Sequence, residues 1–510
     1  MAKPAEKLAE SLEILHKLQK SGAIAIRSAN LTRTHRERLI KNGFLQEVIK
    51  GWYVPSRPDE TTGESTTWYA SYWGFCASYL KYRFRNDWCL SPEQSISIHV
   101  ENWTVPKQLL VRSSAAQNNT TALPHETSLV DVRATVPKGK DIEVKEGLKV
   151  FSLSSALIES SPRYFINAST DVRAALSKIR DASEVLERLL EGGHSIIAGR
   201  LAGAFRNIGR DRIAEDIVET MRTAGYDVRE SDPFEHTAPV FLTGRDISTY
   251  VGRIQLMWQE MRDQVMEIFP ESPGIPDKKE EYLKSVEDIY VTDAYHSLSI
   301  EGYRVSPELI ERVRSGQWNP DSNSEDMESR DTLAARGYWQ ASKAVITSVD
   351  KILKGSNPGN TVDKDHSTWY REMFAPSVTV GILGPADLAG YRNDRVFIRK
   401  SMHVPPSSEA VRDAMPAFFE LLQNEQEPSV RVVLGHWVFV YVHPYMDGNG
   451  RMGRFLMNTM LASGGFPWTV IPVEERDEYM SSLEFASVHN DIKPFAKFLA
   501  KLVSSRQKSD

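Results

Sequence analysis

The stretch RVVLGHWVFVYV-HPYMDGNGRMGR-FLMNTMLAS, residues 431–463, places a polar, glycine-rich loop between two apolar segments. Each apolar segment is long enough to form one buried helix. A polar loop between two core helices costs free energy, because its N–H and C=O groups must find partners. Residues 443–454 are therefore the first candidates for a functional site.

The residue types in this loop suit an anion. Gly448 and Gly450 have no Cβ, so a ligand can approach the backbone N–H groups closely. The loop leads into a helix N-terminus, where the helix dipole favours negative charge. Arg451 and Arg454 lie three residues apart, on about one face of that helix, and their guanidinium groups suit phosphate oxygens. Asn449 can orient a phosphate or share in binding it.

Two more side chains in the loop supply chemistry. Asp447 offers a hard carboxylate oxygen of the kind that Mg²⁺ binds while it keeps phosphates and water as its other ligands. His443 titrates near neutral pH, so it can accept a proton from a hydroxyl group. An anion cradle, a metal ligand and a base so close together in the sequence fit phosphoryl or nucleotidyl transfer to a hydroxyl.

The sequence HPYMDGNGRMGR resembles the signature of the Fic family, HPFx[D/E]GNGRxxR, and departs from its fixed positions only in Tyr445 for Phe. The resemblance extends over about residues 250–503. It implies an all-α bundle with one β-hairpin and the transfer of AMP from ATP to a Ser, Thr or Tyr hydroxyl of a target protein, including the enzyme itself.

The resemblance also implies a role for each residue of the loop. His443 would be the base, and Asp447 would be the ligand of Mg²⁺. Gly448, Asn449 and Gly450 would form the anion hole. Arg451 and Arg454 would bind the phosphates of ATP.

Two segments outside the loop resemble further parts of the family. Residues 390–406, GYRNDRVFIRKSMHVPP, resemble the flap, a β-hairpin that holds the target in strand-like register. Residues 478–499 resemble the C-terminal helices that close over the nucleotide base, and we assign Tyr479 and Asn490 to that base pocket. The flap residues expected to bind the target are Gly390, Tyr391, Arg392, Val396 and Ile398.

The segment YHSLSIEGYRV, residues 295–305, contains Ser297, Glu301 and Gly302 in the spacing of the family's inhibitory motif, [S/T]xxxE[G/N]. A glutamate beside Arg454 would form a bidentate pair and occupy the guanidinium that the γ-phosphate of ATP needs. The resemblance therefore implies an autoinhibited enzyme. In some relatives the same glutamate helps to remove AMP, so removal of AMP by this protein stays open. The alternative to an inhibitory role is that Glu301 is an ordinary surface glutamate near a helix end.

The N-terminal end of the chain is basic. Residues 1–55 contain ten Lys and Arg against five Glu, a net charge of +5, whereas the whole chain carries −6. Two helices followed by a β-hairpin are expected here, which is the order of a winged helix. The residues that could bind DNA are Arg33, Arg36, Arg38 and Lys41. The alternative is a small helical cap with solvated charges.

The middle of the chain reads as a mixed α/β region, with β-like runs at SISIHV (95–100) and QLLVRSS (108–114), followed by helices over 170–227. With the N-terminal head it resembles winged-helix antitoxins of the AbiEi kind. We therefore predict a mainly α protein with three parts. These are a winged-helix-like domain over 1–60, a mixed α/β to helical region over 61–235, and a Fic-type bundle with a β-hairpin flap and an N-terminal inhibitory helix over 236–510.

The composition of the 510 residues, 41% hydrophobic and 25% charged, is that of globular protein and excludes a collagen-like or largely disordered chain. No apolar run reaches the roughly 18–20 residues of a membrane span, and the first residues lack the apolar core of a signal peptide. Cys76 and Cys89 are the only cysteines, which favours a reducing compartment. We expect a cytoplasmic protein without a membrane partner.

Other functions stay open at this point. The chain could be a DNA-binding regulator or a toxin–antitoxin-like fusion whose Fic domain acts as a sensor. It could also be a Fic enzyme that transfers another group, such as UMP, phosphate or phosphocholine. Fic domains often dimerise, so a homodimer is a further expectation. The sequence names neither the target protein nor the modified residue.

Overall fold

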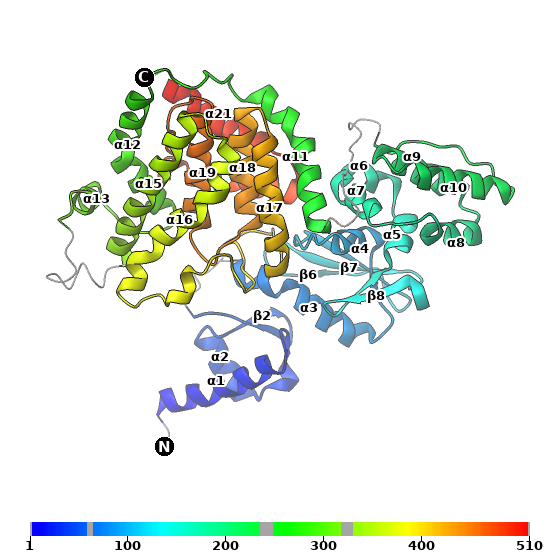
Figure 1. Cartoon of the computed structure of the whole chain (residues 1–510). Coiled ribbons are helices and arrows are strands. Elements are labelled where there is room, and N and C mark those ends of the chain that lie inside the picture. Colours follow the sequence, from blue (N-terminus) through cyan, green and yellow to red (C-terminus); the bar gives the residue numbers. More distant parts are fainter. Residues whose placement is uncertain (1–2, 59–64, 235–247, 318–329, 508–510) are drawn as a thin grey trace. The chain divides into compact units, whose positions relative to one another are not determined.

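The computed structural model describes residues 3–58, 65–234, 248–317 and 330–507. The chain forms two compact units, shown in Figure 1. Unit 1 comprises Met1–Arg245 and Phe397–Val404, and unit 2 comprises Asp246–Val396 and Pro405–Asp510. Helices dominate both units, so the mainly α prediction is confirmed. The predicted domain boundaries near residues 60 and 235 lie in or beside residues outside the described ranges. Within these ranges, every helix is too short or too polar to cross a membrane.

Unit 1 begins with a small helical and β-hairpin subdomain around a core that includes Leu15, Leu39 and Tyr53. Its strands form an antiparallel sheet in the order β1-β3-β2, and Gly51, with φ +80°, makes the turn of the hairpin. The expected order of two helices and a hairpin is therefore present. The elements are α1 (Pro4–Lys20), β1 (Ile26–Arg27), η1 (Ser28–Asn30), α2 (Arg33–Lys41), β2 (Leu45–Ile49) and β3 (Trp52–Pro55).

The second part of unit 1 has a four-stranded sheet in the order β4-β5-β7-β6, in which β5 and β7 run parallel. Its strand β5 matches the prediction at residues 108–114. The elements are α3 (Thr66–Phe84), β4 (Cys89–Leu90), α4 (Pro92–His99), β5 (Gln108–Ser113), β6 (Thr120–Ala122), β7 (Ser128–Arg133), η2 (Gly139–Asp141), β8 (Ile142–Lys145) and β9 (Leu148–Phe151).

The β-like reading of residues 95–100 is wrong, because they lie in and beside helix α4. Ser91 caps this helix by accepting a hydrogen bond from the Gln94 N–H at 3.2 Å, and Pro92 occupies its first turn. The helices expected over 170–227 are present. The remaining helices of unit 1 are α5 (Leu153–Glu159), α6 (Pro162–Asn167), α7 (Ser169–Ser177), α8 (Ser183–Gly192), α9 (Ser195–Asn207) and α10 (Asp211–Thr223).

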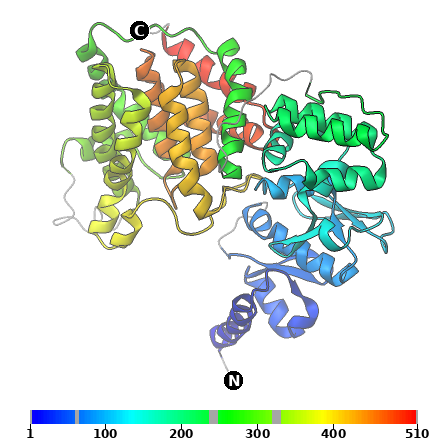
Figure 2. The ribbon, with the colours of Figure 1, turned by 45° about the vertical axis from the view of Figure 1, so that its right-hand side comes forward.

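Unit 2 is a helical bundle around α18 and α19, whose residues are almost all buried. Both helices are orange in Figure 2 and lie among the other helices of the unit. Helices α15 and α16 pack so closely that a Cβ at Gly337 would lie 1.9 Å from the Met373 carbonyl oxygen. The helices before the flap are α11 (Thr249–Ile268), α12 (Lys279–Ile300), α13 (Pro307–Arg314), α15 (Arg330–Leu353), α16 (Pro358–Thr379) and η3 (Pro385–Leu388). Those after it are α17 (Ser408–Asn424), α18 (Pro428–Val442), α19 (Asn449–Ser463), η4 (Val473–Glu475), α20 (Arg476–His489) and α21 (Lys493–Gln507).

Residues 390–406 contain no strand, so the predicted β-hairpin flap is wrong. A hairpin forms when its two halves bond to each other, but here main-chain groups find partners in unit 1. The Met402 carbonyl accepts a hydrogen bond from the Val105 N–H at 2.9 Å, and the Lys400 N–H donates to Thr66 Oγ1 at 3.2 Å. Met402 also packs against the apolar cluster of unit 1.

Candidate active site

The loop between α18 and α19 is held in one conformation by its own residues. His443 ends α18 and Gly448 precedes α19, both with positive φ, at +52° and +80°. A Cβ at Gly448 would lie 2.9 Å from the Phe374 ring, so only glycine fits. Asn449 braces the loop: its Oδ1 accepts from the Tyr445 N–H at 2.9 Å, and its Nδ2 donates to the Tyr445 carbonyl at 2.8 Å. Both ends of the Asn449 side-chain amide are thus engaged by Tyr445, so phosphate binding by this side chain is not supported.

The surroundings of His443 decide which of its ring nitrogens carries a proton. Its Nδ1 lies 3.2 Å from the Val440 carbonyl oxygen, which only accepts hydrogen bonds, so Nδ1 carries the proton and Nε2 carries the lone pair. Burial lowers the pKa of His443 to about 4, against the opposing effect of the bond to Val440. The predicted titration of His443 near neutral pH is therefore wrong. Burial keeps the ring neutral at physiological pH, with a lone pair on Nε2 that can accept a proton.

Arg451 lies between two aromatic rings. Its Cζ is 5.2 Å from the centroid of Tyr303 and 5.1 Å from that of Phe374, and the side chain is 2% exposed. Its Nη2 is 3.5 Å from Asp447 Oδ2. Among the described residues the buried Nε has no hydrogen-bond partner. The two rings hold the cation by cation–π attraction and leave donor capacity for an anion.

Arg454 is bound by the end of α12. Its Nε donates to Ser297 Oγ at 2.8 Å, and its Nη2 donates to the Ser297 carbonyl at 2.9 Å and to Glu301 Oε1 at 2.8 Å. Gly302, with φ +86°, ends the helix directly after Glu301. The sequence predicted a bidentate pair, but Arg454 divides its donors between Ser297 and one oxygen of Glu301.

The Glu301 carboxylate lies over the first turn of α19. A Cβ at Gly450 would be 2.2 Å from Glu301 Oε1 and 3.2 Å from Arg454 Nη1. Burial raises the pKa of Glu301, but the charge of Arg454, and then of Arg451, lowers it more, so the group is ionised. Glu301 thus places a negative charge where the free N–H groups of α19 would bind an anion.

Asp447 is the exposed member of the loop, with 65% of its side chain accessible. Its Oδ1 accepts a hydrogen bond from the Gly448 N–H at 2.7 Å. Within the described ranges no group of three or more His, Cys, Asp or Glu side chains could hold a metal ion. A divalent cation at Asp447 would therefore take most of its oxygen ligands from phosphates and water, which is how Mg²⁺ is usually bound.

The flap residues differ in exposure. Arg392 is 1% exposed and its guanidinium donates to main-chain carbonyls, so it is not available to a target chain. The Tyr391 hydroxyl lies 2.9 Å from His366 Nε2. Gly390, with φ +127°, begins the segment. Val396 and Ile398 are half-buried, and their contact with a target stays a prediction.

The two residues assigned to the base pocket are not brought together. Tyr479 lies in the first turn of α20 and Asn490 follows its last residue, which separates them by about 16 Å along the helix. The buried Tyr479 hydroxyl lies 2.7 Å from His436 Nε2, and Asn490 Nδ2 donates to Glu260 Oε2 at 3.4 Å.

Sequence reasoning missed Tyr303 and Phe374, the two rings beside Arg451. Tyr303 follows the Glu301-Gly302 pair directly, whereas nothing in the sequence marks Phe374.

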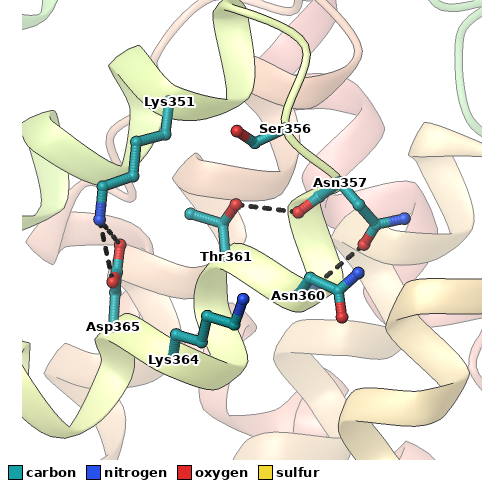
Figure 3. A pocket seen from close by; sticks show the side chains of 7 residues that line it. All are labelled: Lys351, Ser356, Asn357, Asn360, Thr361, Lys364 and Asp365. Carbon is teal, nitrogen blue, oxygen red and sulfur yellow. Dashed lines mark hydrogen bonds and ion pairs between the residues drawn. The ribbon is translucent and has the colours of Figure 1, made fainter.

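A separate hollow of about 330 Å³ lies where α15 turns into α16, and Figure 3 shows its lining. Lys351 and Asp365 close one side through an ion pair of 2.8 Å. No residue of the loop between α18 and α19 lines it. The remaining lining residues are Ser356, Asn357, Asn360, Thr361 and Lys364.

The region around the loop is similar in sequence to a family of known proteins. Residues 366–461 match the model of the Fic/DOC family. A curated protein adenylyltransferase Fic from Nematostella vectensis is 28% identical over 254 residues, which cover 49% of this chain and 55% of the relative. Another, from Drosophila willistoni, is 29% identical over 221 residues, which cover 42% of this chain and 41% of the relative. The chain thus spans about half the length of these relatives.

The segment that matches the family model runs from α16 to α19 and contains the whole loop described above. A solved structure of Fic-1 from C. elegans is 19% identical to this chain. The match covers 68% of this chain and 97% of the Fic-1 chain, with a TM-score of 0.37.

Proposed function

We propose that this protein is a protein adenylyltransferase that moves AMP from ATP to a Ser, Thr or Tyr hydroxyl of a protein and is held inactive by Glu301. The observation that carries the proposal is the Glu301–Arg454 contact of 2.8 Å over the first turn of α19, beside the neutral base His443. A phosphate-binding helix end and a hydroxyl-activating base in one loop suit transfer of a nucleotide. The adenylyltransferase names of the relatives support AMP as the group that is transferred.

The reaction follows from the residues of the loop. His443 Nε2 takes the proton of the target hydroxyl, whose oxygen then attacks the α-phosphorus of ATP. The bond from that phosphorus to the oxygen that bridges to the β-phosphorus breaks, and pyrophosphate leaves. The N–H groups at the start of α19, together with Arg451 and Arg454, bind the phosphate oxygens. Asp447 would hold Mg²⁺, which supplies positive charge against the phosphates.

Glu301 opposes this reaction by occupying the donors that the phosphates need. ATP that enters while Glu301 remains on Arg454 meets a negative charge at the N-terminus of α19 and cannot take the productive pose. Removing the carboxylate frees the Nη2 hydrogen of Arg454 that Glu301 binds, while the bond from Nη2 to the Ser297 carbonyl remains. De-AMPylation by the same glutamate is tested by adding the modified target to wild-type protein and following the release of AMP.

The test is an assay with wild type, Glu301→Gly and Glu301→Gly/His443→Ala, each incubated with cell lysate, Mg²⁺ and ATP labelled at the α-phosphate. We expect protein labelling from Glu301→Gly alone, with the enzyme's own band among the products. Glu271→Gly, at an exposed loop position, is the matched control and should stay as inactive as wild type. Equal labelling by wild type and Glu301→Gly would refute the autoinhibition, and absence of label from every variant would refute AMP transfer.

The same assay separates the other Fic chemistries. Parallel reactions with γ-labelled ATP, α-labelled UTP and labelled CDP-choline report transfer of phosphate, UMP and phosphocholine. Label from one of these and not from α-labelled ATP would keep the enzyme and change the group that it transfers. A homodimer is tested by the mass of the purified protein in solution.

DNA binding by α2 is the second candidate, and the structure favours it less. Arg38 donates to a main-chain carbonyl of α1 at 2.6 Å, and Arg33 pairs with the glutamate one turn further at 2.7 Å. The Cζ of Arg36 is 5.9 Å from the centroid of the Tyr53 ring. Lys41 is exposed. A gel-shift series over salt concentration decides, because phosphate contacts give affinity a steep salt dependence.

A further inference from the structure

Arg392 is buried against the loop between α18 and α19, residues 443–448, which we call the catalytic loop. It donates hydrogen bonds to main-chain carbonyls at the start of this loop. Its Nε donates to the His443 carbonyl at 2.8 Å, and its Nη2 donates to the Val442 carbonyl at 3.5 Å. Its own main-chain N–H donates to the Pro444 carbonyl at 2.9 Å. One residue thus contacts three successive carbonyls, those on either side of the histidine and that of the histidine itself.

The same guanidinium also bonds to both ends of the segment that follows Arg392 in the chain. Nη1 donates to the Asp394 carbonyl at 3.0 Å, and Nη2 also donates to the Pro406 carbonyl. Arg392 therefore joins both ends of residues 392–406 to the backbone of the catalytic loop. Its side chain is 1% exposed, and the pKa of the guanidinium, lowered by burial to about 10, leaves it charged at physiological pH.

The position of these bonds explains why a cation is needed there. The last carbonyls of a helix lack partners within the helix and lie at the negative end of its dipole, which favours a cationic donor. His443 follows α18 in the left-handed conformation, with φ +52° and ψ +60°, which a residue with a Cβ rarely adopts. Such a conformation persists only where its surroundings enforce it. Arg392 supplies the bonds at this point.

We propose that Arg392 is a positioning residue of the transfer reaction: by binding the carbonyls of Val442 and His443 and the N-terminal and C-terminal ends of residues 392–406, it holds the backbone of His443 so that Nε2 faces the hydroxyl to be deprotonated. This inference rests on the proposed AMP transfer. Arg392 touches neither substrate nor reacting atoms and acts through the position of His443.

Arg431 provides a matched control for a merely structural role. It is also buried, with 7% exposure, and donates to the carbonyls of Glu425 at 2.6 Å and Gln426 at 3.2 Å. It lies near the start of α18, about 18 Å from the catalytic loop along the helix. Replacing either arginine by lysine keeps the charge and removes the planar set of donors.

The first experiment compares Glu301→Gly with Glu301→Gly/Arg392→Lys and Glu301→Gly/Arg431→Lys. We expect Arg392→Lys to lower kcat about 10–100-fold while the KM for ATP changes less than about threefold, because the histidine is misplaced and the phosphate site is intact. Arg431→Lys should lower Tm by about as much as Arg392→Lys lowers it, and it should leave kcat within about threefold of the kcat of Glu301→Gly. Equal kcat for the two double variants would overturn the inference, whichever way Tm moves.

A second measurement does not depend on activity. The His443 ring signals of otherwise wild-type protein are identified by NMR from their loss in His443→Ala, and then titrated in Arg392→Lys and Arg431→Lys. We expect the titration of His443 to change only with Arg392→Lys, as the ring gains access to water. If Glu301→Gly shows no transfer, the proposed function fails and this titration alone decides; an unchanged His443 signal in Arg392→Lys overturns the positioning role.

Discussion

Helices α2 and α19 both carry arginines in their first two turns. The sequence predicts that α2 binds the phosphates of DNA and that α19 binds those of a nucleotide. In α19 the arginines are buried and have specialised surroundings: Arg451 lies between two rings, and Arg454 is bound by Ser297 and Glu301. In α2, Arg33 is exposed and pairs with its neighbour one turn away.

The difference lies in what surrounds the arginines of each helix, and under the proposed function it separates a phosphate site from an ordinary basic helix. Exposed arginines are surrounded by water and salt, so each contributes little, and such ion pairs are worth at most about 1 kcal/mol. Buried arginines must have a partner, because an unpaired buried charge is costly. In α19 the buried Arg454 has Glu301 as its partner. An anionic ligand that replaced Glu301 would give Arg454 the partner that it needs. Four predictions test this contrast, all of them in proteins that carry Glu301→Gly unless stated.

The largest effect is expected at the base. His443→Ala should lower kcat about 10²–10⁴-fold, the usual contribution of general base catalysis, while ATP affinity stays within about threefold. His16→Ala, at an exposed position of α1, is the control and should leave both quantities unchanged. Steady-state kinetics and calorimetric titration with ATP measure the two quantities, and a joint fall of kcat and ATP affinity in His443→Ala would contradict the assignment.

The next effect contrasts the two helices directly. Arg454→Ala should weaken ATP binding about 10–150-fold, because a charge-assisted hydrogen bond to phosphate is worth about 1.5–3 kcal/mol. Arg33→Ala in α2 should change ATP affinity by less than about twofold. Calorimetric titration of both variants decides, and equal losses would show that burial does not distinguish the two sites.

A smaller effect is expected at the rings that enclose Arg451. Tyr303→Leu removes one cation–π partner, worth about 1–2 kcal/mol in a desolvated site, and should weaken ATP binding about 5–30-fold. Phe485→Leu, at a 41% exposed position of α20, is the control. If the Tyr303 and Phe485 variants bind ATP equally well, the rings play no part in holding the arginine.

The smallest effect concerns pH and uses proteins with the native Glu301 and with Glu301→Gln. The folded pKa of Glu301 lies below its ordinary value of 4.5. A carboxylate with a lowered pKa stabilises the fold above the unfolded pKa and loses this contribution as pH falls through the folded pKa. Wild type should therefore exceed Glu301→Gln in Tm by about 1–2 °C between about pH 6 and 8, and the difference should shrink below about pH 4.5. A difference that grows on acidification would contradict the lowered pKa.

Sequence reasoning is most direct where local structure depends on neighbours in the chain. The residues His443 to Arg454 are contiguous, and the period of 3.6 residues places Arg451 and Arg454 near one another without knowledge of the fold. The helices over 170–227 and the strand near residue 108 follow from the same local rules.

The errors arose where local pattern competes with distant partners. Residues 95–100 alternate like a strand, but Ser95 Oγ accepts a hydrogen bond from the Phe151 N–H at 3.0 Å, and the segment is helical. Residues 390–406 suggested a hairpin, but the segment bonds to Val105 and to the catalytic loop through Arg392. The sequence predicts that Tyr479 and Asn490 share a pocket, but they lie at opposite ends of α20.

The sequence by itself therefore determined which residue types stand together: a histidine, a carboxylate, glycines and two arginines in one loop and the helix that follows it. Only the tertiary structure decided the surroundings of these groups. It brought Glu301 and Ser297 of α12 to Arg454, Phe374 of α16 to Arg451, and Arg392 to the backbone of His443. The physical reason is that residue types and local periodicity are properties of neighbouring residues, whereas burial, pKa and hydrogen-bond partners depend on segments that meet only when the core packs.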